Sequence, residues 1–96
     1  MNKNTLINNS DPDEMLKLSK KITTYANDLK QDMKKLLNTH QEMHSCWSGK
    51  QYDDFSKVIE EVNAVIQTQA EKLLTISQDV EKDAKQLKKL QGVDVR

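Results

Sequence analysis

The stretch Ser45-Cys46-Trp47-Ser48-Gly49 separates two long segments that have the pattern of amphipathic helices. It contains the only tryptophan of the chain and one of its two glycines. Neither proline nor glycine interrupts the segment that runs back to Pro12 or the one that runs on to Gly92. Because these two residue types most often end helices, the sequence predicts two long helices joined by one tight turn.

The turn has residues that can fix the start of the second helix. Ser48 and Gln51 have the spacing of a capping box, which places Trp47 and Tyr52 at the two positions of a hydrophobic staple. Gly49 has two possible explanations, which the sequence leaves open. It supplies a positive φ at the end of the first helix, or it lets the second helix approach closely where a side chain would clash.

The start of the first helix is marked by the stretch Asp11-Pro12-Asp13-Glu14. Asp11 suits the N-cap, Pro12 the first helical position, and Glu14 completes a capping box. We therefore expect a flexible arm over residues 1–10, a helix over about 12–45, a turn over 46–49, a second helix over about 50–91 that Gly92 ends, and a short tail over 93–96.

Both segments carry apolar residues in alternating steps of three and four, which is typical of a helix with one apolar stripe. Strict repeats of seven indicate left-handed supercoiled packing, so the predicted fold is all-α, an antiparallel two-helix hairpin. The stripe of the second helix is too wide for one partner helix, which predicts dimerisation into a four-helix bundle. The first segment has Met15, Ile22, Leu29, Leu36 and Met43, with Leu18, Tyr25 or Ala26, Met33 and Leu37 beside them; the interface candidates of the second are Ile59, Val62, Ile66, Leu73, Val80, Leu87 and Leu90.

A fold at Ser48 pairs positions symmetrically about that residue, so Met15 is expected near Val80. Residues beyond about Asp83 then have no partner in the first helix. We therefore expect Leu87 and Leu90 to overhang the hairpin and to pack on another protein, which favours a heteromer over a homodimer.

The composition excludes several classes of protein. The 96 residues have 35% hydrophobic and 31% charged residues and a formal net charge of zero. A nucleic-acid binder usually shows a basic excess, and no apolar run approaches the length of a membrane span. Residues 1–9 have no apolar core of the length that a secretory signal peptide needs, and a single cysteine allows no internal disulfide.

His40 and His44 are four residues apart with Cys46 close by, a spacing that can bring two imidazoles to one metal ion. No further ligands follow at a characteristic spacing, so two surface histidines are the favoured interpretation. A two-helix hairpin also lacks the concave pocket and the third positioned group that a nucleophilic site needs. We therefore expect no catalytic residue, no metal and no cofactor.

Trp47-Ser48-Gly49 between two long helices, in a chain of this length, resembles the WXG family, the small early-secreted-antigen-like proteins of ESX, or type VII, secretion. The Asp-Pro start of the first helix and Phe55 soon after the turn add to the resemblance, which covers essentially the whole chain. In that family the Trp and Gly of the turn are structural and form half of a bipartite export signal.

The other half of that signal, Tyr-x-x-x-Asp/Glu near the end of the second helix, is absent, because the only tyrosines are Tyr25 and Tyr52. The resemblance implies a secretion substrate or partner that contacts a secretion ATPase and leaves a Gram-positive type of bacterium without a cleaved signal peptide. It pairs with itself, with another WXG-like chain or with the helical N-terminal domain of a larger toxin. The alternatives are a cytoplasmic adaptor or chaperone for such a toxin and a generic coiled-coil scaffold.

Overall fold

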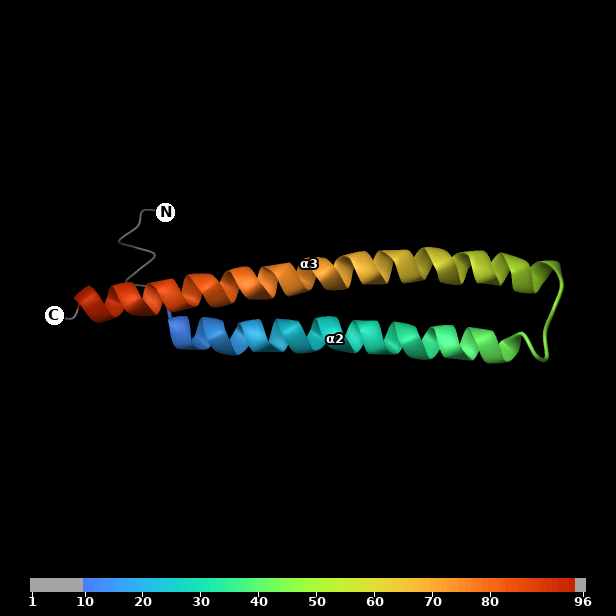
Figure 1. Ribbon diagram of the computed structural model, residues 1–96, viewed down its shortest axis with the longest axis horizontal. Helices are drawn as coiled ribbons and strands as arrows, with labels where there is room; N and C mark the ends of the chain where they lie inside the picture. Colours follow the sequence, from blue (N-terminus) through green and yellow to red (C-terminus); the bar gives the residue numbers. More distant parts are fainter. Residues whose placement is uncertain (1–9, 95–96) are drawn as a thin grey trace. The chain divides into compact units, whose positions relative to one another are not determined.

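The protein consists of two long helices joined by a short turn, in a computed structural model that describes the backbone of residues 10–94 and the side chains of residues 10–92. Helix α2 spans Pro12–Met43 and helix α3 spans Lys50–Asp94 (Figure 1). The two helices form a helical hairpin, and the described residues contain no strand. The expected arm over residues 1–10 lies outside the described residues, apart from Ser10.

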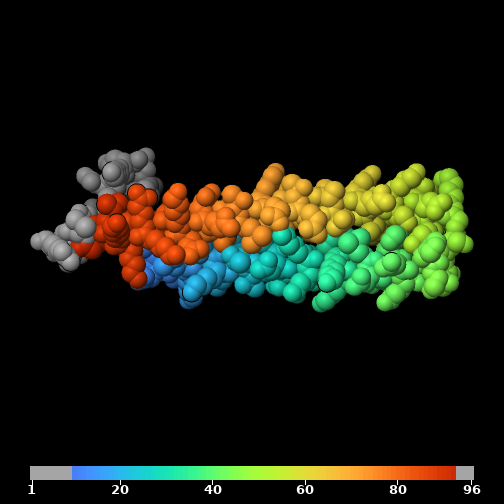
Figure 2. All heavy atoms as spheres, viewed as in Figure 1, coloured from blue at the N-terminus to red at the C-terminus, as the bar shows by residue number. Residues whose placement is uncertain are grey.

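The hairpin divides into two compact units, and each contains a segment of both helices. The turn unit is Tyr25–Lys72, and the terminal unit combines residues 10–24 with residues 73–94. In both units the side chains of the two segments meet along their length (Figure 2).

The ends of the helices follow from local hydrogen bonding. Asp11 is the N-cap of α2, because its Oδ1 accepts from the Glu14 N–H at 3.1 Å and its carbonyl accepts from the Met15 N–H at 2.9 Å. Helix α3 continues through Gly92 to Asp94, so the prediction that Gly92 ends the helix is wrong. A glycine in the last turn weakens a helix but does not force it to end.

The terminal unit is packed through small residues. Ser19, Ser77 and Ala84 are almost completely buried, so small side chains form much of the contact between the two helix segments. The Ser77 hydroxyl donates to the Ser19 carbonyl at 3.1 Å and is hydrogen bonded to the Thr23 hydroxyl. These bonds satisfy polar groups that would otherwise be costly to bury.

The expected overhang of α3 is not present. Leu87 is only 7% exposed, Lys88 Nζ forms an ion pair with Asp13 at 2.9 Å, and Gln91 Nε2 donates to the Ser10 carbonyl at 3.0 Å. The register expected from a fold at Ser48 would have placed Asp13 opposite Asp83 instead. The start of α2 therefore covers the part of α3 that was expected to need another protein.

The turn unit has a larger apolar seam. Ala26 and Met33 of α2 are buried against the unit's α3 segment, in which Ile59 and Ala70 are also buried. An ion pair between Lys30 and Glu71 joins the two segments at the edge of this seam.

The buried line of α2 differs from the predicted one. Pro12, Ser19, Ala26 and Met33 are its buried members, again seven residues apart, whereas Ile22 and Leu29 are half-buried. The structure also decides between the two alternatives at one predicted position: Ala26 is fully buried and Tyr25 is exposed. The predicted line of Met15, Ile22, Leu29, Leu36 and Met43 is thus the flank of the seam, whereas Ala26 and Met33 of the predicted second line lie at its centre.

Candidate interaction site: the turn and the apolar face

The turn depends on Gly49. Its φ is +107°, and a Cβ added there would meet nothing within 4 Å. Of the two explanations, the conformational one therefore holds and the close approach does not. Gly49 is also the N-cap of α3, because its carbonyl accepts from the Asp53 N–H at 3.0 Å.

The predicted capping box is not formed. Helix α3 begins at Lys50, one residue later than a Ser48 cap requires, and both Ser48 and Gln51 are exposed. The end of α2 is closed instead by backbone bonds to the Met43 carbonyl, from the Trp47 N–H at 2.9 Å and the Cys46 N–H at 3.1 Å. Six residues, 44–49, then separate the helices.

An aromatic cluster holds the turn against both helices. The rings of Trp47 and Tyr52 have a T-shaped arrangement with centroids 5.6 Å apart, and the centroid of the Trp47 ring lies 5.9 Å from that of Phe55. Tyr52 is buried, and it stacks in parallel on His40 with centroids 5.1 Å apart. Contacts of this geometry add to the stabilisation that comes from burial alone.

Hydrogen bonds fix the same cluster from within. The Tyr52 hydroxyl donates to the His40 carbonyl at 3.2 Å. The Ser56 hydroxyl donates to the Tyr52 carbonyl at 3.0 Å, and the His40 Nε2 lies 2.7 Å from the Ser56 Oγ. Because the Ser56 hydrogen is already used, His40 Nε2 is the donor to Ser56 Oγ.

Both histidines near the turn contact the Tyr52 ring, whereas the Cys46 thiol faces a backbone carbonyl. His40 faces Ser56, His44 lies 5.2 Å from the Tyr52 ring, and the exposed thiol of Cys46 points to the Met43 carbonyl at 3.5 Å. Over the described residues, no cluster of three or more His, Cys, Asp or Glu side chains is placed to hold a metal ion.

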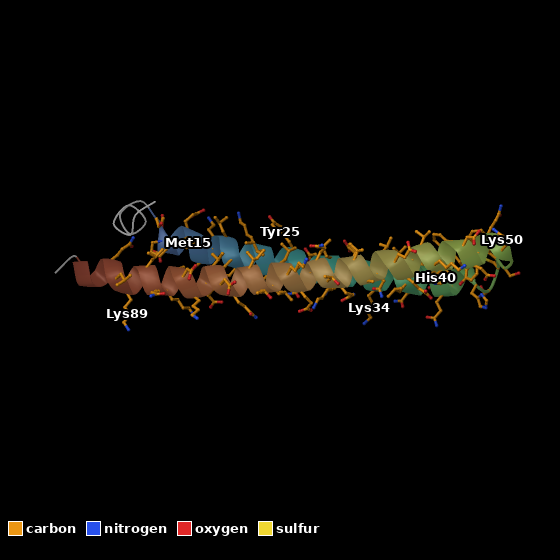
Figure 3. The ribbon with its side chains drawn as sticks, turned by 90° about the horizontal axis from the view of Figure 1, so that it is seen from above. Met15, Tyr25, Lys34, His40, Lys50 and Lys89 are labelled. Atoms are coloured by element: carbon orange, nitrogen blue, oxygen red, sulfur yellow. The ribbon has the colours of Figure 1, made fainter. Side chains whose placement is uncertain are left out.

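A second candidate site is an exposed apolar surface of the turn unit, which we call the apolar face. Tyr25 is 59% exposed and Val65 is 56% exposed, although both are large apolar side chains. Figure 3 shows Tyr25 projecting from the helices. Contiguous apolar surface of this kind on a small protein marks a site of interaction. The apolar face consists of Tyr25, Leu29, Leu36, Val58, Val62 and Val65.

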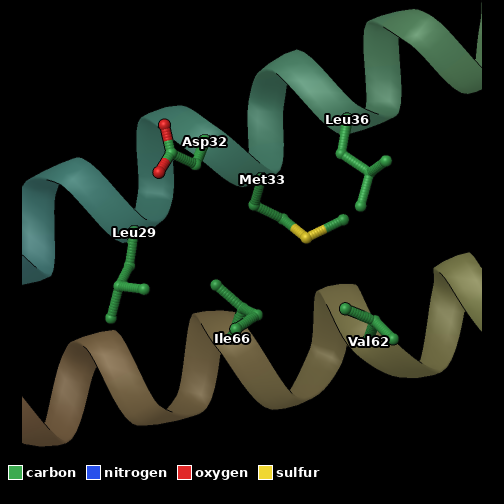
Figure 4. Close-up of a pocket in the computed structure, with 6 residues that line it drawn as sticks. All are labelled: Leu29, Asp32, Met33, Leu36, Val62 and Ile66. Atoms are coloured by element: carbon green, nitrogen blue, oxygen red, sulfur yellow. The ribbon is translucent and has the colours of Figure 1, made fainter.

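The apolar face includes a groove between the two helix segments. Leu29, Met33 and Leu36 of α2 point toward Val62 and Ile66 of α3 (Figure 4). The volume of the groove is about 180 Å³. The carboxylate of Asp32 is the only charged group in its lining.

The predicted interface candidates divide between the interior and the surface of the hairpin. Ile59 and Leu87 are buried within it, Val62 is exposed, and four are half-buried: Ile66, Leu73, Val80 and Leu90. The candidates did not include Tyr25, Leu36, Val58 and Val65, although Val58 and Val65 widen the sequence stripe. The sequence could have identified Tyr25 and Leu36 as interface residues, because both lie on the same side of the apolar stripe of the first segment.

Fold and turn together define a class of protein, a helical hairpin with Trp-x-Gly at its turn and one apolar face. Within that class, the chain belongs to the WXG100 family, described as proteins of 100 residues with WXG, whose model matches residues 9–90. The WXG residues of this chain are Trp47, Ser48 and Gly49. The match excludes the interpretation that this tripeptide is a chance occurrence in an unrelated coiled coil.

Membership links the chain to type VII secretion, the system that the WXG family serves. No curated protein and no solved structure matches the sequence. Within residues 10–94, neither helix is apolar enough over a sufficient length to cross a membrane.

Proposed function

We propose that this protein is a small type VII secretion substrate or secretion partner that acts by pairing its hairpin with another WXG-type hairpin. The observation that carries the proposal is the apolar face, which lies in the same unit as the turn motif. An apolar surface that water covers in the free chain gains free energy when a partner helix covers it, about 25 cal/mol for each Å² buried.

In this proposal the turn and the apolar face bind different proteins. Trp47 is half-buried in its aromatic cluster, so part of its ring remains accessible to a secretion ATPase. The apolar face takes the paired hairpin. Since the Tyr-x-x-x-acid element is absent from this chain, the paired hairpin either contributes that element or a different tail feature replaces it.

Export of the intact chain tests the proposal. We expect the protein in the culture medium at its full length, and we expect Trp47→Ala to reduce its export. Lys50→Ala is the matched control, because Lys50 is an exposed neighbour of the turn and pairs only with Asp54 on the surface. Circular dichroism of both variants separates loss of folding from loss of recognition. Full export of a folded Trp47→Ala variant would contradict the role of the turn.

The alternative is a cytoplasmic adaptor that delivers a larger type VII toxin with a helical N-terminal domain. The same apolar face would then bind that domain. Recovery of the protein only from cells, in a complex with a larger chain, would support the adaptor and contradict the substrate.

A further inference from the structure

The terminal unit separates positive from negative charge around α3. Lys82, Lys85 and Lys89 are three and four residues apart, so they share one side of the helix. Asp79 and Asp83 share another side, about 110° around the helix from the lysines. The net charge of zero for the whole chain therefore does not describe the lysine side of this unit.

Helix α2 adds lysines to the same side of the unit. Lys85 Nζ forms an ion pair with Glu81 at 2.9 Å. The hydrogen bond and the charge of Lys85, together with the charge of Lys20, lower the pKa of the Glu81 carboxyl, so lysines of both helices lie close to it. Lys17 is three residues from Lys20 and lies beside it on α2. We call this surface the lysine patch, and it consists of Lys17, Lys20, Lys82, Lys85, Lys88 and Lys89.

The lysine patch has an excess of positive charge. Its two ion pairs use the carboxylates of Asp13 and Glu81, so four of its six positive charges remain uncompensated. Lys82 and Lys89 are exposed and form no ion pair or hydrogen bond with a residue that the structure describes. Figure 3 shows Lys89 projecting away from α3. Because like charges repel, an anionic partner on the patch would relieve this repulsion.

The chemistry of the patch favours a continuous anionic surface over a single shaped ligand. Its basic residues are all lysines, whose hydrated point charges on flexible stems lack the rigid fork of arginine. The side chains of Lys85 and Lys88 are 67% and 62% exposed, so their charges stand on open surface. Clusters of about four to eight basic residues on an amphipathic helix typically bind anionic lipid headgroups.

We propose that the lysine patch docks the terminal unit on a membrane that contains anionic phospholipids, with the side of Lys82, Lys85 and Lys89 toward the headgroups. Attraction of this kind acts over about one Debye length, roughly 10 Å at 0.1 M salt, so lysines that face the headgroups contribute most. The apolar face belongs to the turn unit, so this docking goes beyond the pairing of hairpins and does not depend on it.

Vesicle sedimentation tests the partner. The full chain is mixed with vesicles of phosphatidylcholine alone, or of equal parts phosphatidylglycerol and phosphatidylcholine, at about 0.1 M salt. We expect binding to the anionic vesicles only, and its loss at about 1 M salt, where the Debye length is about 3 Å. Equal binding to both kinds of vesicle would overturn the proposal. Binding to polyglutamate but to neither kind of vesicle would also overturn it, and would indicate an acidic protein as the partner.

Paired substitutions test the patch. Lys82→Gln combined with Lys89→Gln should lower the affinity for anionic vesicles by about fivefold for each lysine, or about 25-fold together. Lys34→Gln combined with Lys35→Gln is the matched control, because it removes the same charge from exposed positions of the turn unit. We expect the control to bind almost as the natural sequence does, with circular dichroism showing that both variants fold. Equal losses would mean that net charge, and not the patch, determines binding.

A polarity-sensitive fluorophore tests the orientation. In a Cys46→Ser background, Gln78→Cys places the label on the lysine side of α3, and Ile76→Cys places it about 160° away around the helix. Anionic vesicles should change the emission of the label at position 78 and not at position 76, and the reverse would overturn the orientation. A chain that docks but pairs with no hairpin would contradict the proposed function alone, whereas a chain that pairs but does not dock would overturn this inference alone.

Discussion

The two glycines of this chain allow one substitution to be tested in two opposite contexts. Gly49→Ala places a Cβ on a residue with φ of +107°, a conformation that side chains rarely adopt, although the space around it is open. Backbone strain of this kind costs on the order of 1–3 kcal/mol. Gly92→Ala places the same Cβ inside α3, also in open space. There the change should be neutral or stabilise by less than about 1 kcal/mol, because alanine favours the helix.

Thermal unfolding followed by circular dichroism measures both effects. For a domain of this size, about 1 kcal/mol corresponds to a shift of the melting temperature by about 4–8 °C. We expect Gly49→Ala to melt lower than the natural sequence, and Gly92→Ala to melt at the same temperature or higher. The comparison requires equal protein concentrations, because association changes the apparent stability. A Gly49→Ala variant that melts at or above the temperature of Gly92→Ala would refute the assignment of strain to Gly49.

Three further predictions concern the terminal unit. Leu87→Ala should lower the free energy of unfolding by about 2–5 kcal/mol in urea unfolding, as for other buried leucines, while the exposed neighbour Gln86→Ala should have little effect; equal effects would mean that Leu87 is not part of the hairpin core. Ser77→Ala should cost about 0.5–1.5 kcal/mol by the same measurement, because it removes hydrogen bonds to buried groups; a stabilised variant would contradict this. The hydrogen bond and the charge of Lys85 lower the pKa of Glu81, so the stabilisation is present above the ordinary carboxyl pKa and is lost as the pH falls through the lowered value. Glu81→Gln should therefore lower the melting temperature slightly at neutral pH and not in strong acid, and a difference that grows toward acid would have the wrong sign.

Much of the fold could be predicted because it depends on local signals. Asp11 and Pro12 mark the start of α2, and the repeats of seven place the apolar residues on one side of each helix. The centre of the seam could not be predicted, because Ser19 and Ser77 are polar and their burial depends on partners far away in the sequence. The register was also wrong at the chain ends, where Asp13 pairs with Lys88 instead of lying opposite Asp83.

The candidate site was predicted less completely. The aromatic contact of Trp47 with Tyr52 followed from their spacing, but the capping residue of α3 did not, because Ser48 and Gly49 are both acceptable N-caps. The exposure of Tyr25 and Leu36 depends on which flank of the stripe faces α3. That choice is made by the packing of Ala26 and Met33, and no local pattern reveals it.

The seam of small residues has a consequence for amide hydrogen exchange. No large side chain among the described residues is fully buried, and three of the seven buried apolar residues are alanines. Each helix is therefore covered on one side only, by the other helix. Because a local opening exposes little apolar surface, it should require little free energy. Slow exchange of amides in the middle of α2 would then indicate that a partner protein is bound to the apolar face. On dilution, the loss of this protection at each residue would follow the dissociation of that partner.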